Sequence, residues 1–148
     1  MLPIYIDVKT DDDGDLTISS SGDLELADAS RTLLQTTMFR IKTSYQDYEI
    51  QPMIGANIDS IIGYNNTRIN GQKIVDLIIR SFTHDGFLSP SQFTVKPAPI
   101  GPSTIAIAIK FDIIPGVDTA TVLLVTINYD TGDIEMIAGT DQQGSGSL

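Results

Sequence analysis

The sequence predicts an α+β fold made of an N-terminal β-meander, three helices and a C-terminal antiparallel β-hairpin with an extra strand. Short apolar segments separated by Asp-Gly and Ser-Gly turns fill the first 28 residues. Apolar residues then recur at helical spacing as far as residue 82, and two long segments rich in β-branched residues follow. The length of 148 residues suits a single domain, which we place at residues 1–140, followed by a flexible tail at 141–148.

Three short strands make up the predicted meander. Leu2–Val8 is apolar and partly alternating, and a Ser-Gly turn joins Leu16–Ser19 to Asp23–Leu26. Residues 10–15 are predicted to form a solvated turn, because Asp and Gly accept left-handed backbone angles. A calcium-binding EF-hand loop is the alternative for this Asp-rich segment, but its bidentate glutamate would fall on Ser20. The turn is therefore the preferred interpretation.

Two of the predicted helices precede residue 64. The first spans Ser30–Lys42, with Asp28 or Ser30 as its N-cap. The second is a short helix within residues 54–63, with Gly63 as its C-cap. Both carry apolar residues at helical spacing. In the first helix these are Leu33, Leu34, Met38 and Ile41, and in the second they are Ile58, Ile61 and Ile62.

The third predicted helix spans Asn65–Phe82, with Asn65 or Asn66 as its N-cap. Gly71 in its interior is unfavourable by about 1 kcal/mol relative to alanine. His84, the one histidine of the chain, follows in a His-Asp-Gly turn. No serine or acidic partner at a catalytic spacing accompanies it, so we expect a surface or capping role rather than a triad or a zinc site.

The remaining chain is predicted to be β. Ser91–Pro97 is the extra strand, and Ser103–Ile114 and Thr119–Asp130 form the long hairpin. Ile134–Gly139 is a short return strand after a tight turn.

The net charge of −10 is concentrated at the two ends. Residues 1–28 hold eight acidic residues and one basic residue, and residues 130–148 hold four acidic residues and no basic one. This distribution argues against binding to nucleic acid or to anionic lipid. It leaves two alternatives, solubility alone or a basic partner that faces the acidic ends.

Several further classes are not expected. The chain has no cysteine for disulfides or thiolate metal sites, its N-terminus lacks a signal-peptide pattern, and no apolar run is long enough to span a bilayer. Its glycines are not grouped as in nucleotide-binding loops. We therefore predict no cofactor, no metal and no membrane association.

Asp47 and Glu49 are the one pair of acids that could serve an enzyme. They lie two residues apart beside Tyr45 and Tyr48, and a strand would place both carboxylates on one face. Glycosidases need two such groups flanking the bond that they cleave. The alternative is structural, with one acid accepting hydrogen bonds from the backbone of a connection between helices.

The order of several motifs resembles that of a known family. Gly22-Asp23-Leu24 precedes a helix that ends at Thr43; Asp47 follows, and then the Pro-x-x-Gly motif from Pro52 to Gly55. Between Gly22 and Tyr129 this order resembles the tail sheath initiator, or baseplate wedge, family of contractile phage tails. That family includes a baseplate subunit of type VI secretion systems and was once labelled lysozyme-like.

Two positions depart from the pattern of this family. The Gly-Glu pair of the family falls here on Gln46-Asp47, which keeps an acid with a shorter side chain. The Glu-Pro-Arg stretch falls on Ser89-Pro90-Ser91, where Pro90 alone is retained.

The resemblance implies a structural protein of the virion, with no enzymatic activity. It would be made in the host cytoplasm and would sit in six copies in the contractile-tail baseplate. Its expected partners are the tail sheath subunit and the baseplate wedge subunits, with the tail tube as a further one. It would link the baseplate to the sheath and template the first sheath ring by strand addition. A lysozyme-like cell-wall glycosidase that uses Asp47 and Glu49 is the alternative function.

The long C-terminal strands fit this expectation. They carry few charges, and exposed strands of that kind aggregate unless another chain pairs with them. We predict that the partner-binding residues are Val122, Leu123, Leu124, Val125 and Thr126. The alternative is that both strands lie in the interior of the sheet.

Overall fold

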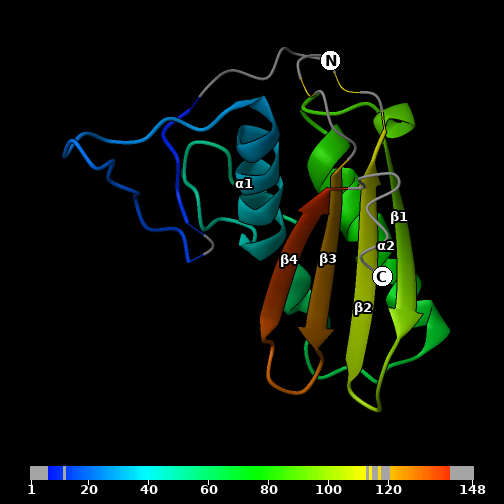
Figure 1. Cartoon of the computed structure of the whole chain (residues 1–148). Coiled ribbons are helices and arrows are strands. Elements are labelled where there is room, and N and C mark those ends of the chain that lie inside the picture. The colour runs from blue at the N-terminus through cyan, green and yellow to red at the C-terminus, as the bar shows by residue number, and fades with distance from the viewer. Residues whose placement is uncertain (1–6, 12, 113, 115–116, 118–120, 141–148) are drawn as a thin grey trace, which may run out of the picture.

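The computed structural model describes residues 7–11, 13–112, 114, 117 and 121–140. Within them, two α-helices and two 3₁₀ turns precede or flank a single four-stranded sheet (Figure 1). The predicted architecture was wrong: the described N-terminal residues form no continuous strand, and the predicted short helix is only a 3₁₀ turn. Most of Leu2–Val8 and the tail at 141–148 lie outside the described residues.

The helix α1 spans Ala29–Lys42. The Asp28 side chain accepts a hydrogen bond from the backbone N–H of Arg31 at 2.8 Å, so Asp28 is the N-cap. The helix ends where the Thr43 N–H reaches the Phe39 carbonyl. Arg40 and Lys42 in the last turn complement the helix dipole.

The helix α2 spans Arg68–Thr83 and begins three residues after the first predicted cap. The Thr67 side chain caps it by accepting from the Asn70 N–H at 3.2 Å. The 3₁₀ turns are η1 at Ile58–Ile61 and η2 at Pro90–Gln92. Gly71 has a packing role, because a Cβ there would lie 2.9 Å from the Cδ1 atom of Ile105.

The sheet consists of β1 at Phe93–Pro99, β2 at Thr104–Phe111, β3 at Thr121–Asn128 and β4 at Ile134–Thr140. The strands pair antiparallel in the order β1-β2-β3-β4, so β3 is an interior strand with a neighbour on each side. The predicted hairpin and extra strand are thus one continuous sheet. The ends of the predicted hairpin strands at residues 113 and 119–120 lie outside the described part.

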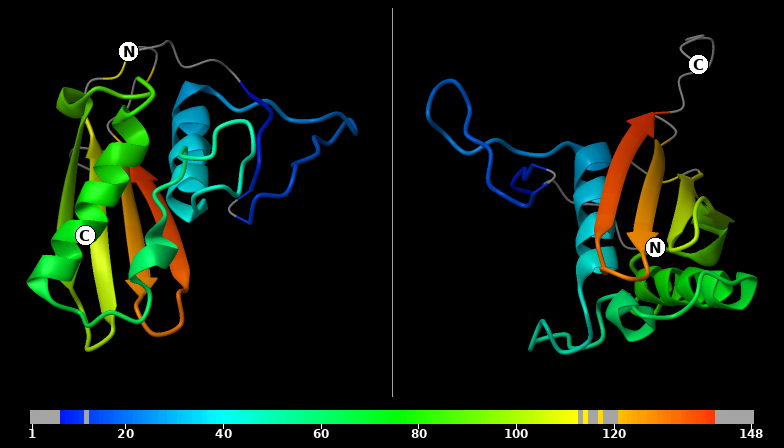
Figure 2. Two further views of the ribbon diagram at one scale, coloured as in Figure 1. Left: turned by 180° about the vertical axis from the view of Figure 1, so that it is seen from behind. Right: turned by 90° about the horizontal axis from the view of Figure 1, so that it is seen from below.

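The core fills the space between the helices and one face of the sheet, called here the inner face. α2 crosses this face, and α1 lies beside β4 (Figures 1 and 2). Alternate residues of β2 and β3 are buried there, as the two-residue period of a strand requires. The fully buried core side chains include Leu33, Ile41, Ile74, Ile78, Phe82, Ile107, Ile109, Leu123 and Val125.

Residues 7–11 and 13–27, called here the N-terminal lobe, lie on the side of α1 away from the sheet (Figures 1 and 2). Isolated bridges join Val8 to Leu26, Thr10 to Leu16 and Ile18 to Leu24. The predicted short strands at residues 16–19 and 23–26 are thus held only by single bridges.

Candidate functional site

Four of the predicted motif residues, Thr43, Asp47, Pro52 and Gly55, lie in the segment 43–57, called here the connection, which joins α1 to η1. Its two ends are held together by backbone hydrogen bonds. The Ala56 N–H donates to the Arg40 carbonyl at 2.8 Å, and the Asn57 N–H donates to the Thr43 carbonyl at 3.2 Å. These bonds use carbonyls that the end of a helix otherwise leaves unpaired. The connection is therefore a closed loop fixed to the end of α1.

Gly55 lies directly against the backbone of Thr43. A Cβ at residue 55 would lie 2.8 Å from the Thr43 Cβ and closer still to the Thr43 carbonyl oxygen. Only glycine fits such an approach. Gly55 therefore allows the two ends of the connection to pack closely.

Hydrogen bonds inside the connection fix its shape. The Asp47 carboxylate accepts from the Ser44 N–H at 2.9 Å, and the Pro52 carbonyl accepts from the Gln46 N–H at 2.7 Å. Gln46 adopts a positive φ of 69°, and Asn57 adopts one of 58°. Asp47 thus accepts a hydrogen bond from the backbone of the connection, as the structural alternative predicts of one acid, and Glu49 is an exposed surface acid.

Arg80 of α2 binds the other side of the connection. Its Nη2 atom donates to the Gly55 carbonyl at 3.0 Å, and its guanidinium lies 4.7 Å from the centre of the Tyr45 ring. The connection is thus held by both helices. Local sequence patterns do not reveal this role of Arg80, because its partners lie 25 or more residues away along the chain.

A second arginine ties the two helices together. Arg40 is buried in α1, and its guanidinium makes two hydrogen bonds to the Asp85 carboxylate, at 3.0 and 2.8 Å. It also donates to the Ser81 carbonyl at 2.7 Å and lies 4.4 Å from the centre of the Phe87 ring. Burial raises the pKa of the Asp85 carboxyl, but the bonds and charge of Arg40 outweigh it and lower that pKa. The sequence gives one indication that Arg40 is buried, because residue 40 lies seven positions after Leu33 and so on the apolar side of the helix.

The other predicted site residues lie apart from the connection. Pro90 is the first residue of η2, where the Ser89 N–H donates to the Gln92 side chain at 2.8 Å. His84 is exposed at the end of α2, beside Asp85, as expected for a surface turn. The Asp11 carboxylate accepts from the N–H groups of Asp13 and Asp15, which confirms a turn in this acidic segment.

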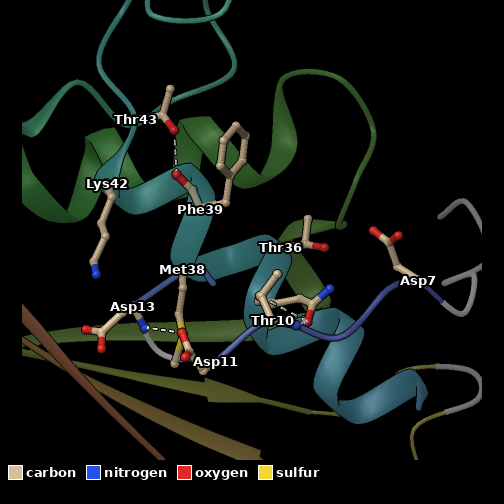
Figure 3. Close-up of a pocket in the computed structure, with 11 residues that line it drawn as sticks. Asp7, Thr10, Asp11, Asp13, Thr36, Met38, Phe39, Lys42 and Thr43 are labelled. Carbon is tan, nitrogen blue, oxygen red and sulfur yellow. Dashed lines mark hydrogen bonds between the residues drawn. The ribbon is translucent and has the colours of Figure 1, made fainter. Parts of the chain in front are cut away.

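A cavity of about 350 Å³ lies between the N-terminal lobe and α1 (Figure 3). Asp7, Asp11 and Asp13 line it from the lobe, and Met38 and Lys42 line it from α1. Among the described residues, no group of three or more acidic or histidine side chains is placed to hold a metal ion. Asp47 and Glu49 do not line this cavity, so the glycosidase alternative gains no support from it.

The predicted partner-binding residues Val122–Thr126 lie in β3. Because β2 and β4 occupy both sides of this strand, its backbone has no free edge for an added strand. The prediction that these residues pair with a strand of another chain was therefore wrong. The sheet has two edges in the described structure, at β1 and at β4.

The edge at β1 is protected. The Asp112 N–H donates to the Gln92 carbonyl, so even-numbered residues of β2 direct their backbone toward β1. Lys96 pairs with Ala108, and the neighbouring Pro97 therefore occupies a position whose backbone points away from the sheet. Pro99 occupies the next such position. A proline has no N–H to offer there, so this edge cannot readily accept a strand.

The edge at β4 carries no such protection. The Asn128 N–H donates to the Asp133 carbonyl at 3.0 Å, so even-numbered residues of β3 direct their backbone N–H and C=O groups toward β4. Thr126 pairs with Glu135, and the neighbouring Met136 therefore directs its backbone away from the sheet, as Ile134 and Ala138 do. The strand has no proline and one charged residue. Part of it extends past the end of α1 (Figure 1).

Comparisons with protein-family models, with curated proteins and with solved structures find no match for this chain. In the part of the chain that the structure describes, neither helix is long and apolar enough to cross a membrane.

Proposed function

We propose that the protein is a structural subunit of a contractile-tail baseplate, which links the baseplate to the tail sheath and templates the first sheath ring by strand addition at β4. The expected location is the virion baseplate, in six copies. Its partners would be the sheath subunit, the wedge subunits and, as a further one, the tail tube. The family resemblance supports the assembly, and the geometry of the sheet supports the mechanism.

The observation that carries the mechanism is the difference between the two sheet edges. β1 presents Pro97 and Pro99 at positions whose backbone points outward, whereas β4 presents Ile134, Met136 and Ala138 with their N–H groups intact. Natural sheets protect edges that must stay unpaired. A sheet that protects one edge and leaves the other competent is suited to accept one strand on one side.

The position of α1 restricts where the new strand would pair. The helix lies next to β4, but the beginning of the strand extends past the end of the helix (Figure 1). The added strand would therefore pair first with the beginning of β4. Pairing along the whole strand would require α1 to shift.

The connection supports the same role through rigidity. Thr43, Asp47, Pro52 and Gly55 meet in one closed loop that Arg80 fixes to α2. A template for a ring of subunits must hold its sheet and helices in one arrangement. The motif residues supply that fixed geometry, and no chemical step needs them.

The mechanism is tested with a pair of proline variants. Met136→Pro removes an outward N–H from β4, and Val95→Pro does the same on β1, where two prolines already protect the edge. Both side chains are partly buried on the inner face, so the two variants are matched for packing loss. Each variant is first checked for a cooperative thermal transition, and each is then added to baseplates assembled without this protein.

Sheath polymerisation on these baseplates, counted by electron microscopy with the cognate sheath subunit, is the readout. We expect the wild type and Val95→Pro to support sheath rings and Met136→Pro to fail. Equal sheath growth with Met136→Pro would reject strand addition at β4. Equal growth on baseplates that lack the protein altogether would reject the proposed function.

A further inference from the structure

The N-terminal lobe carries an apolar surface that the fold itself does not use. Four large aliphatic side chains of the lobe are between 49% and 69% exposed. They are Leu16, Ile18, Leu24 and Leu26. They do not contribute to the hydrophobic core. We call these four residues the lobe face.

The backbone places the four residues on one side of the lobe. A bridge pairs Ile18 with Leu24, and the Glu25 N–H donates to the Thr17 carbonyl at 3.1 Å. Leu16 and Leu26 lie two residues from the bridged pair, and in extended chain every second side chain points the same way. The lobe face is therefore one contiguous patch on two neighbouring segments.

The lobe is attached to the rest of the protein through its first segment. The Gln35 side chain of α1 accepts from the Thr10 N–H at 3.2 Å and donates to the Val8 carbonyl at 2.9 Å. Arg31 donates to the Thr10 carbonyl at 2.6 Å. The segments that carry the lobe face are thus presented on the side of α1 away from the sheet (Figures 1 and 2).

The negative charge near the lobe face restricts the kind of partner that can bind it. Residues 7–28 are acidic as a whole, with eight acidic residues and one basic residue, Lys9, which already pairs with Glu25 at 3.4 Å. Asp15, Asp23 and Glu25 adjoin the lobe face in sequence and form its acidic rim. A second copy of the lobe would bring two such acidic rims together, and an anionic membrane would be repelled in the same way. Apolar patches rimmed by polar residues are typical of protein interaction sites.

We propose that the lobe face docks onto a partner protein that presents the apolar face of an amphipathic helix with a lysine- or arginine-rich rim. The four aliphatic side chains would supply the buried contact, and the acidic rim would select the basic partner and speed its encounter. This docking surface is separate from β4. It does not depend on the proposed function.

The test uses a defined probe. The probe is a synthetic amphipathic helical peptide with a leucine face and a lysine rim, and the control peptide carries glutamate in place of lysine. Each is titrated into the isotopically labelled full chain, and binding is followed by backbone NMR shifts. The variants are Leu24→Ser/Leu26→Ser on one segment and Leu16→Ser/Ile18→Ser on the other. Ile69→Ser is the control, because Ile69 is 71% exposed on α2.

We expect the lysine peptide to shift signals of the lobe and the glutamate peptide to shift none. Either double variant should weaken binding about tenfold or more, while Ile69→Ser leaves it unchanged. The variant Asp15→Asn/Asp23→Asn keeps the lobe face intact and should reduce both the affinity and its dependence on salt.

Three results would overturn the proposal. One is equal binding of the two peptides. Another is equal weakening by Ile69→Ser and by the double variants. The third is a dimer of the free chain in light scattering that Leu24→Ser/Leu26→Ser converts to a monomer, which would assign the lobe face to a second copy. Unchanged α1 and sheet signals in each variant show that the body remains folded.

Discussion

Gly55 packs its backbone against that of Thr43, so closely that a side chain at residue 55 would overlap the Thr43 carbonyl. The same Thr43 carbonyl accepts the Asn57 N–H at 3.2 Å. These two contacts close a segment of fifteen residues, 43–57, onto the end of α1. They give Gly55 a structural role in closing this segment.

A Gly55→Ala substitution should destabilise the protein by about 2–3 kcal/mol, because the new methyl group forces Thr43 and Gly55 apart. Gly139→Ala is the matched control, since a Cβ there meets nothing within 4 Å. That control should be neutral or slightly stabilising. Urea unfolding of the two variants measures the difference, and equal stabilities would contradict the close approach.

Truncation of Asp47 should cost stability rather than an activity. Asp47→Ala removes the bond to the Ser44 N–H and should lower the free energy of unfolding by about 0.5–1.5 kcal/mol. Glu49→Gln should leave it unchanged, because Glu49 is an exposed acid. Thermal melts test the stabilities, and a turbidity assay on purified cell walls tests the enzyme alternative. Cell-wall cleavage by the wild type that disappears in both variants would revive that alternative.

The Arg40–Asp85 pair predicts a loss of stability in acid. The folded-state pKa of Asp85 lies below its unfolded value of about 3.9, so its contribution is complete above that value and is lost as pH falls through the folded pKa. Asp85→Asn should remove this part of the pH dependence. It should also cost about 2–3 kcal/mol near neutral pH by leaving the buried Arg40 charge without its carboxylate. Unfolding curves between about pH 3 and pH 7 test both effects, and an unchanged acid slope in the variant would contradict the assignment.

Tyr129 predicts a loss of stability in alkali, whereas Asp85 predicts one in acid. Its side chain is fully buried, and its hydroxyl has no hydrogen-bond partner among the described residues. Burial raises the pKa of Tyr129, so stability falls as pH rises above the unfolded value of about 10. Tyr129→Phe should be neutral or up to about 1 kcal/mol more stable near neutral pH, and it should resist alkali better than the wild type. A destabilised Tyr129→Phe would reveal a partner for the hydroxyl.

The caps and approximate bounds of the helices and strands could be predicted from the sequence better than the way in which these elements pack together. Asp28 was available as a cap and began α1 as expected, but Thr67 displaced Asn66 at the start of α2. Asn66 instead donates to the Gly101 and Thr104 carbonyls, which a local pattern cannot reveal. The predicted extra strand ended at Pro97, yet β1 continues to Pro99, because a proline on an edge strand loses only an outward N–H.

The candidate site shows the same contrast between local features, which the sequence predicts, and long-range contacts, which it does not. Thr43, Asp47, Pro52 and Gly55 were found because they lie close together in sequence and follow a recognisable spacing. Arg40 and Arg80 were missed because their partners lie far away along the chain. The position of Val122–Thr126 in the interior of the sheet depends on strand order, which β-propensity does not encode.

Hydrogen exchange of single amides in β4 tests the central proposal most directly. In the free protein, the amides of Met136 and Ala138 should exchange rapidly because they point away from the sheet, while those of Glu135 and Ile137 are protected by β3. On addition of the cognate sheath subunit, strand addition predicts new protection at Met136, the position nearer the beginning of β4, with no change at Val95 on β1. Unchanged exchange at Met136 in the assembled complex would contradict strand addition at β4.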